Sequence, residues 1–520
     1  MSLISKFSTV GGATMASRLA GFVREALIGA ALGAGPVADA FYAAFRFPNL
    51  FRRLFAEGAF NAAFIPLFAK QLEGGGEAAA RRFASEVLSF LAVFLIAISA
   101  LAIMAMPFLV GTIIAPSFAE DPAKFDLTVD LTRIMFPYLF CMSLVAMLSG
   151  ILNSMRRYFL AAFVPVLLNL ILIAVLVPAL SLGFTQEATG LWLAIGVFAS
   201  GVAQLVLLWI GVRRTGFGFT LRAPKLTPGV KRLMILMGPA LLTGGVTQIN
   251  LLVGQIIASA QPGAIALLNY ADRINQLPLG VVGIAVGVVL LPELARALKA
   301  GDDTDAQHLQ NRSLEFALGL TVPATIGLML LPGPIVALLY ERGAFTAQTT
   351  AMTAAALAAF ASGLPAYVLL KVFSPAYFAR EDMKTPMWFS MAAVIVNIAG
   401  SLLLFPRFGH VGIAAATSIS AWTNLVLLAG TLWWRDHFRP SPTTMKRVGL
   451  ILFASAVMGA LLWAMQMAFA GQLAGPLATR LATVAAMVGI AAIVYFAIVV
   501  ATGAVERGDL KRLARRRRAP

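Results

Sequence analysis

Five arginines lie between residues 18 and 53, in stretches of the chain that are otherwise apolar: Arg18, Arg24, Arg46, Arg52 and Arg53. Three acids in the same region, Glu25, Asp39 and Glu57, leave a charge surplus of +2. The guanidinium group is planar, always charged and able to donate two parallel hydrogen bonds to one anion. This arrangement favours a binding site for a phosphate or pyrophosphate group.

The spacing of these residues predicts which of them share a helix face. Arg46 and Arg53 are seven residues apart and lie on one face with Asn49, whereas Arg52 is rotated by about 100° from Arg53. Glu57 follows Arg53 by four residues and can neutralise one charge. The alternative interpretation is that the arginines form buried ion pairs that hold the first two helices together. The charge surplus argues against it.

The elements that carry these arginines belong to a polytopic membrane protein. Of the 520 residues, 60% are hydrophobic and 12% are charged, and the mean hydropathy is +0.86. A soluble domain carries about twice that share of charged residues. The single cysteine, Cys141, excludes a disulfide framework.

A bilayer core about 30 Å thick requires roughly 20 apolar residues per spanning helix. On this basis the sequence predicts fourteen transmembrane helices, at residues 7–32, 37–69, 87–115, 131–153, 158–182, 188–212, 233–260, 264–294, 316–339, 348–378, 386–406, 410–434, 448–470 and 481–503. If the N-terminus is cytoplasmic, 28 Lys and Arg residues fall on the cytoplasmic side and four on the other: Lys124, Arg342, Arg407 and Arg480. This asymmetry follows the positive-inside rule and predicts that both termini are cytoplasmic.

An internal repeat relates helices one to six to helices seven to twelve. Arg156, Asn169 and Pro178 match Lys384, Asn397 and Pro406, each displaced by 228 residues, and Tyr42-Ala43 matches Tyr270-Ala271 at the same offset. Because six is an even number, the two copies cross the membrane in the same direction. We therefore expect two pseudo-symmetric six-helix lobes with a substrate site between them.

Other function classes find little support in the sequence. The net charge of +17 is explained by basic loops at the membrane, so no nucleic-acid partner is expected. No nucleotide-binding, zinc-protease or paired-acid motif occurs, which predicts a protein that is not an enzyme and that has no cofactor and no metal site. The three histidines, His308, His410 and His437, are expected in surface loops.

Several blocks of sequence resemble the MurJ/MviN family, the lipid II flippases of the MOP exporter superfamily. They are residues 17–25 (SRLAGFVRE), 38–41 (ADAF), 47–60 (FPNLFRRLFAEGAF), 269–273 (NYADR) and 377–386 (YFAREDMKTP). The resemblance extends over essentially the whole chain, and the block at 47–60 is highly specific.

The resemblance implies an N-lobe (1–215), a cytoplasmic linker (216–232), a C-lobe (233–440), two further helices (441–505) that hold the lipid tail, and a basic tail (506–520). It implies a flippase that moves lipid II, undecaprenyl-pyrophosphoryl-MurNAc-pentapeptide-GlcNAc, across the bacterial cytoplasmic membrane by alternating access through a cationic cavity. The matching substrate-binding residues are Arg18, Arg24, Arg52, Arg53 and Arg273, with Ser17 and Asn49 beside them. The acids Glu25, Asp39, Glu57 and Asp272 would serve gating or charge balance. Membrane lipids and lipid II are the expected partners of a monomer, with the cell-wall synthesis machinery as a candidate.

Two departures from the family pattern and three rival functions accompany this interpretation. Gln276 stands where some members carry an acid one turn after the second-copy arginine, and only Asn250 and Asn397 occur where some members have acids of a sodium site. The main alternative is a flippase for another undecaprenyl-pyrophosphate-linked oligosaccharide. A drug/cation antiporter would require an acidic cavity, and a membrane scaffold would not explain the arginine surplus.

Overall fold

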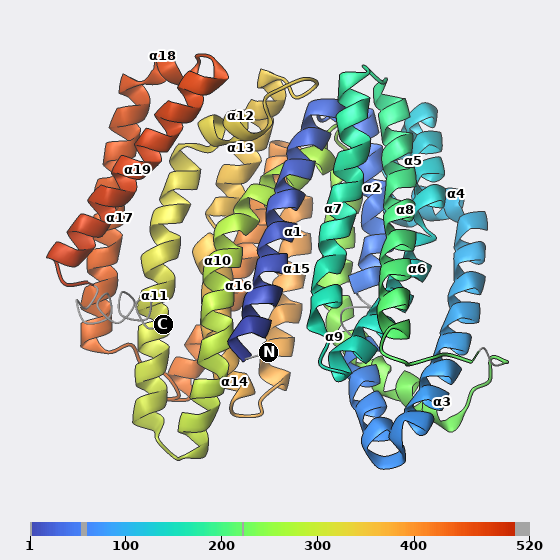
Figure 1. Cartoon of the computed structure of the whole chain (residues 1–520). Helices are drawn as coiled ribbons and strands as arrows, with labels where there is room; N and C mark the ends of the chain where they lie inside the picture. The colour runs from blue at the N-terminus through green and yellow to red at the C-terminus, as the bar shows by residue number, and fades with distance from the viewer. Residues whose placement is uncertain (1–2, 54–59, 221–222, 505–520) are drawn as a thin grey trace. The chain divides into compact units, whose positions relative to one another are not determined.

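The computed structural model describes residues 3–53, 60–220 and 223–504, and within these ranges all regular secondary structure is helical, without a strand. Figure 1 shows the helices in chain order by colour. The chain divides into two compact units. The first consists of Met1–Ala266 with Arg342–Thr346, and the second of Leu267–Glu341 with Ala347–Pro520.

The first unit contains long helices joined by short turns. Its elements are α1 (Leu3–Leu32), α2 (Pro36–Phe51), α3 (Phe60–Met104), α4 (Met106–Leu109), the π-helical turn η2 (Val110–Ile114), the 3-10 turn η3 (Pro116–Glu120), α5 (Pro122–Met135), α6 (Tyr138–Ser154), α7 (Tyr158–Ser181), α8 (Gln186–Arg213) and α9 (Pro228–Ala258). Capping side chains fix several helix starts: Asp121, Thr185 and Thr227 each accept a hydrogen bond from a backbone amide of the following first turn.

The second unit continues the same pattern. Its helices are α10 (Ala264–Lys299, whose first turn lies in the first unit), α11 (Asp303–Leu330), α12 (Pro332–Tyr340), α13 (Ala347–Ala361), α14 (Leu364–Phe378), α15 (Lys384–Phe408), α16 (His410–Trp434), α17 (Pro442–Ala468), α18 (Ala470–Leu473) and α19 (Leu477–Ala501). One core cluster joins α10, α11, α14 and α16, and a second joins α11, α17 and α19. In the second cluster the Tyr495 hydroxyl donates to the carbonyl of Gly319 at 2.6 Å, which ties α19 to α11.

Ten helical segments in the described ranges are long and apolar enough to cross a membrane. They are α3, α5 with α6, α7, α8, α11, α13 with α14, α15, α16, α17 and α19. The chain is therefore an all-helical, multi-pass membrane protein, as the sequence predicts. The predicted total of fourteen also needs the spans in α1, α2, α9 and α10, and it stays a prediction.

The helices also differ from the sequence prediction in detail. Helix α3 runs through the stretch between two predicted spans and is broken at Gly76, whose φ of 70° favours glycine. The expectation that the histidines lie in surface loops is wrong for two of them. His308 lies in α11, and His410 is the buried first residue of α16, where its Nε2 lies 2.9 Å from the carbonyl oxygen of Met352.

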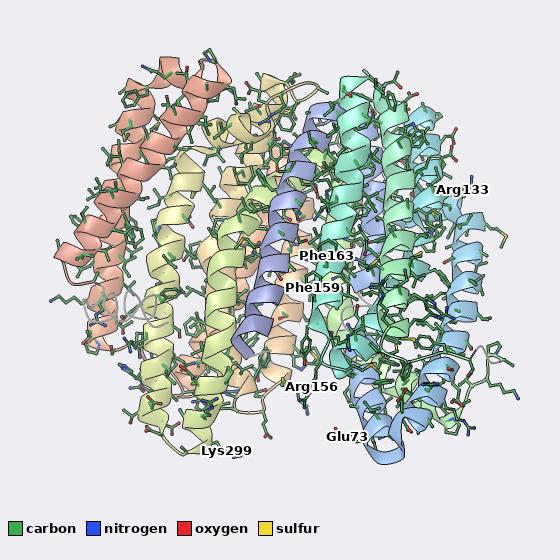
Figure 2. The ribbon with its side chains drawn as sticks, in the orientation of Figure 1. Glu73, Arg133, Arg156, Phe159, Phe163 and Lys299 are labelled. Atoms are coloured by element: carbon green, nitrogen blue, oxygen red, sulfur yellow. The ribbon has the colours of Figure 1, made fainter. Side chains whose placement is uncertain are left out.

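The ends of the first unit carry charged side chains. Figure 2 shows Arg156 and Glu73 at one end of this unit and Arg133 toward the other. Arg133 lies in the last turn of α5, is 41% exposed and approaches Asp130 at 3.8 Å. Its position near a helix end agrees with a side chain that extends to the membrane interface.

Candidate functional site

The structure gives the predicted site residues different degrees of exposure. Arg24, Glu25 and Asp39 are buried; Ser17, Asn49 and Arg52 are half-buried; Arg18 and Arg53 are exposed. In the second unit Asp272 and Arg273 lie half-buried on α10, and Gln276 is exposed and donates to the Asp272 carboxylate. Glu57 lies outside the described residues, and so does its predicted pairing with Arg53.

Arg24 is the centre of a buried polar network that joins α1, α2 and α7. Its Nη1 donates to Asn169 Oδ1 at 2.9 Å, and its Nη2 forms an ion pair with Glu25. The Tyr42 hydroxyl donates to the other Glu25 oxygen at 2.7 Å. Asn169 in turn donates from Nδ2 to the Ser17 carbonyl at 2.9 Å. A buried charge is tolerated when it is paired and hydrogen-bonded, as it is here.

In this conformation Arg24 contacts protein groups, namely Glu25 and Asn169. This agrees with the alternative interpretation, in which the arginines form buried ion pairs that hold helices together. One donor, Arg24 Nε, is buried and has no hydrogen-bond partner within the described residues. A cavity of about 10 Å³ lies beside it, bounded also by Glu25, Tyr42 and Phe45. That volume holds about one water molecule and no larger ligand.

Arg52 has a different environment from Arg24. Its Nε donates to Asn49 Oδ1 at 2.8 Å, so the structure brings these two predicted substrate residues together on α2 and its continuation. Arg53 and Arg18 expose their side chains to the surroundings. Arginines that are half-buried or exposed can reach an anion, whereas Arg24 would first have to leave its partners.

Asp39 forms a second buried network. Its side chain is completely buried, and Oδ2 accepts from Lys124 Nζ at 2.9 Å and from the Gly263 amide at 2.7 Å. Oδ1 accepts from the Ala266 amide at 3.1 Å. The Lys124 ammonium lies 3.8 Å from the centre of the Phe118 ring, a cation–π contact.

The Asp39 carboxylate therefore caps the first turn of α10 and neutralises Lys124. The amides of a helix start attract a negative group, both as hydrogen-bond donors and through the helix dipole. The position of Gly263 is fixed as well, because its φ is +79° and a Cβ there would lie 2.6 Å from the Ala34 carbonyl oxygen. Because Asp39 already neutralises Lys124, one acid fewer is available to offset the positive charge of the arginines of α1 and α2.

Three residues of these networks have no predicted role: Lys124, Tyr42 and Asn169. Lys124 is predicted as a loop cation on the side opposite the cytoplasm, whereas the structure places it buried in the first turn of α5. For Tyr42 and Asn169 the internal repeat could have indicated a role, because both residues recur 228 residues later, as Tyr270 and Asn397. The second-copy counterpart Asn397 is also buried.

We expect Tyr42→Phe to lower the free energy of unfolding by about 1–2 kcal/mol, because the Glu25 carboxylate then loses one donor. Asn169→Ala should lower it further, since it leaves a buried guanidinium nitrogen without an acceptor. The measurement is the thermal unfolding midpoint of purified protein in detergent. Tyr158→Phe, at an exposed tyrosine on α7, is the matched control. Equal midpoints for Tyr42→Phe and Tyr158→Phe would contradict the role of the Tyr42 hydroxyl.

The sequence comparisons agree with one another. A family model described as "Lipid II flippase MurJ" matches residues 28–499. The "Probable lipid II flippase MurJ" of Rhizobium tropici is 51% identical over 527 residues, which cover 100% of this chain and 98% of the relative. The "Lipid II flippase MurJ" of Burkholderia cenocepacia is 35% identical, covering 89% of this chain and 90% of the relative.

The chain belongs to the MurJ family. A solved structure described as "Lipid II flippase MurJ, inward closed conformation" matches with a TM-score of 0.77 and 24% identity, over 94% of this chain and 97% of that one. An inward-facing MATE multidrug resistance transporter of the MOP superfamily matches with a TM-score of 0.65 and 15% identity, over 83% and 94% of the two chains. The chain thus has the fold of MurJ and of MOP transporters.

Membership of the MurJ family makes this protein a transporter and not a hydrolase. It also makes the chain a multi-pass bacterial membrane protein. Within the described residues, no three His, Cys, Asp or Glu side chains are grouped in a way that could hold a metal ion.

Proposed function

We propose that this protein flips lipid II from the inner to the outer leaflet of the bacterial cytoplasmic membrane. The observation that carries the proposal is the match of the family model over residues 28–499, together with relatives that bear the same name over nearly their whole length. Both termini lie in the cytoplasm in this proposal, as the distribution of Lys and Arg predicts. The protein works as a monomer, because one chain supplies both lobes.

The arginines of the two lobes bind the pyrophosphate in the proposed mechanism. The contacts of Asp39 and Glu25 support this assignment, because Asp39 neutralises Lys124 and Glu25 neutralises Arg24, so each of these two acids already has a cationic partner. A pyrophosphate carries several oxygens that accept paired hydrogen bonds from a guanidinium fork. We therefore assign Arg18, Arg52 and Arg53 of the first unit, with Arg273 of the second, to the pyrophosphate, and Ser17 and Asn49 to supporting contacts.

Arg24 has a conditional role in this mechanism. It contacts Glu25 and Asn169 in the conformation described here. During alternating access the helices exchange contacts, and Arg24 would transfer from Glu25 to the substrate as the cavity admits it. Glu25 thus serves as the resting partner of Arg24, and we assign Asp272 to charge balance beside Arg273. Asp39 acts by positioning the start of α10.

The experiment that tests the proposal is complementation of a strain depleted of its own lipid II flippase. We expect this chain to restore growth and the accessibility of lipid II to a label added outside the cell. A flippase for another undecaprenyl-pyrophosphate-linked sugar would leave lipid II inaccessible while it restored the export of that sugar. That outcome would replace lipid II as the substrate.

We expect flipping to continue without ATP and to depend on the membrane potential or on an ion gradient, because the sequence has no nucleotide-binding motif. One elementary charge that crosses the field contributes about 2.3 kcal/mol per 100 mV, which is enough to bias a two-state carrier. The measurement is the flipping rate in vesicles of controlled potential and pH at constant ATP. A rate that stays the same after the potential and the gradients are dissipated would contradict this prediction.

A further inference from the structure

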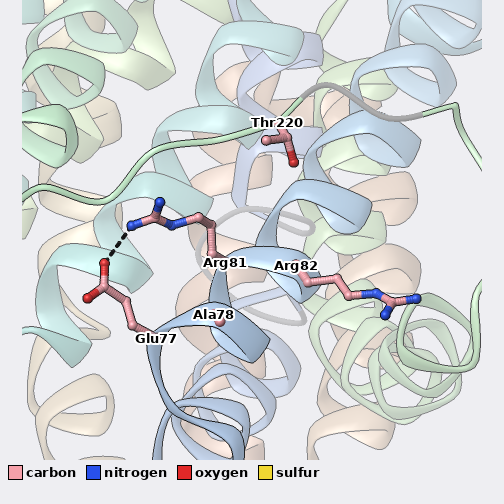
Figure 3. A pocket seen from close by; sticks show the side chains of 5 residues that line it. All are labelled: Glu77, Ala78, Arg81, Arg82 and Thr220. Carbon is pink, nitrogen blue, oxygen red and sulfur yellow. Dashed lines mark hydrogen bonds and ion pairs between the residues drawn. The ribbon is translucent and has the colours of Figure 1, made fainter.

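A surface cavity of about 400 Å³ lies in the first unit, away from the two networks described above. It is lined by Glu77, Ala78, Arg81 and Arg82 of α3 and by Thr220 of the linker that joins α8 to α9. Figure 3 shows the two arginine side chains extending to opposite sides of the helix, with Thr220 across from them. The volume is in the range of small-ligand sites, about 300–1,000 Å³.

The walls of this cavity are held together by specific contacts. The Thr220 amide donates to Ser85 Oγ at 3.1 Å, and the Thr227 hydroxyl donates to Glu86 Oε2 at 2.8 Å. Phe217 is buried, with its ring centre 5.8 Å from that of Phe68 and 5.7 Å from the Arg81 guanidinium carbon. The linker is thus docked on α3, and the cavity between them is a defined feature of the fold.

Both arginines keep hydrogen-bond donors for a ligand. Arg81 uses a single nitrogen, Nη2, to contact Glu77 at 2.7 Å and the Gly216 carbonyl at 3.2 Å. Its Nε is buried and cannot reach a ligand in the cavity, so Nη1 is the nitrogen that remains for one. Arg82 contacts Glu86 through Nε alone, at 3.1 Å, and its side chain is 69% exposed. The acids therefore orient the two guanidinium groups and leave other nitrogens of each available.

The charge of the linker favours an anion in this cavity. Between Glu187 and Asp272 the sequence contains no acid, and residues 213–232 contain six cations. Among them Arg213, Arg214 and Lys225 are exposed. A surface patch of one sign raises the local concentration of the opposite charge. Glu77 and Glu86 balance the two cavity arginines, so the linker supplies the excess positive charge.

We propose that this cavity binds a phosphate group, held by the guanidinium group of Arg81, while Arg82 on the other side of α3 adds positive charge without contacting the same oxygens. The group belongs to the headgroup of an anionic lipid or to a soluble phosphate compound, since both offer the same oxygens. The site is separate from the arginines of α1 and α2, so its ligand would not be the substrate in transit. Its occupation would hold the linker against α3.

The protein offers a direct probe of this site, because its one cysteine, Cys141, is buried. Ala78→Cys adds an exposed thiol to the cavity wall, and its rate of alkylation by a maleimide reports occupation. One arm uses protein in detergent with inorganic pyrophosphate. The other uses nanodiscs of phosphatidylglycerol and of phosphatidylcholine. We expect the alkylation rate to fall about tenfold when the ligand concentration is about ten times its Kd.

Matched variants separate specific binding from general shielding. Ala300→Cys places an exposed thiol on a turn of the second unit and should show no protection. Adding Arg81→Gln and Arg82→Gln to the Ala78→Cys chain should abolish protection, and Arg81→Gln alone serves if the combined variant does not accumulate. Arg439→Gln, which removes another exposed arginine paired with an acid, should leave protection intact.

The two arms identify the source of the phosphate. Protection by phosphatidylglycerol alone assigns a lipid headgroup, and protection by pyrophosphate assigns a soluble ligand. Absence of protection in both arms would overturn the proposal. So would protection that persists undiminished without the two arginines.

Discussion

Lys124→Met should destabilise the protein by about 3–5 kcal/mol, because it leaves the Asp39 carboxylate buried without its cation. The Lys124 ammonium lies 2.9 Å from Asp39 Oδ2, and both side chains are almost inaccessible to solvent. Asp39→Asn should also be strongly destabilising, since it leaves the buried Lys124 ammonium without a negative partner. We expect both variants to accumulate poorly in membranes and to unfold at lower temperature in detergent.

The double variant Asp39→Asn with Lys124→Met tests the pairing. It should be more stable than the sum of the two single changes predicts, because neither charge is then left alone. Lys124→Arg, which keeps the charge, should be milder than Lys124→Met. The same cycle on the exposed pair Asp436 and Arg439 is the control and should give a coupling of about 1 kcal/mol or less. Strict additivity at Asp39 and Lys124 would contradict the assigned ion pair.

Arg52→Lys should abolish most of the flipping activity while leaving the amount of protein in the membrane unchanged. Lysine keeps the charge but lacks the planar fork that donates two parallel hydrogen bonds to a phosphate. Loss of one charge-assisted contact lowers the affinity for the pyrophosphate by about tenfold or more. The measurement is complementation of the depleted strain at matched expression, followed by the accessibility of lipid II.

Two controls accompany Arg52→Lys. Arg133→Lys makes the same change at the end of α5 and should behave like the parent protein. Asn49→Ala removes the acceptor of Arg52 Nε and should be milder than Arg52→Lys if the guanidinium acts mainly on substrate. If Arg52→Lys supports growth as well as the parent does, the claim of paired hydrogen bonds to pyrophosphate fails. The cavity would then contribute only a diffuse positive potential.

The helices could be predicted from the sequence because each is encoded locally. Apolar stretches of about 20 residues recur along the chain, and each of the ten segments able to cross a membrane overlaps a predicted span, although the bounds differ. The breaks inside helices were harder to predict. Gly76 ends a run of three consecutive glycines between two predicted spans, which predicts a break, but the sequence did not predict that helix continues on both sides of it. His410 is buried at a helix start by its contact with Met352, 58 residues away.

The buried polar networks could be predicted only in part. Glu25 neighbours Arg24 in the sequence, so charge balance between them is a local inference. Asp39 has no such neighbour, and its partner Lys124 lies 85 residues further on. A pairing of that kind depends on how α5 packs, which hydropathy and charge distribution do not specify. The convergence of Arg18, Arg52, Arg53 and Arg273 on one substrate also depends on tertiary arrangement, and it stays a prediction.

The three donors of Asp39 become available at different times while the ribosome synthesises the chain. Lys124 follows Asp39 by 85 residues, whereas the amides of Gly263 and Ala266 follow it by 224 and 227. At about 5–20 residues per second, the lysine is added roughly 4–17 s after the carboxylate and the Gly263 amide roughly 11–45 s after it. In that interval the nascent α2 can have the ammonium as a partner before α10 exists. Lys124 is thus the first partner available to the Asp39 carboxylate while α2 is inserted into the membrane. Loss of Lys124 should therefore lower the yield of inserted protein, in addition to lowering the stability of the folded protein.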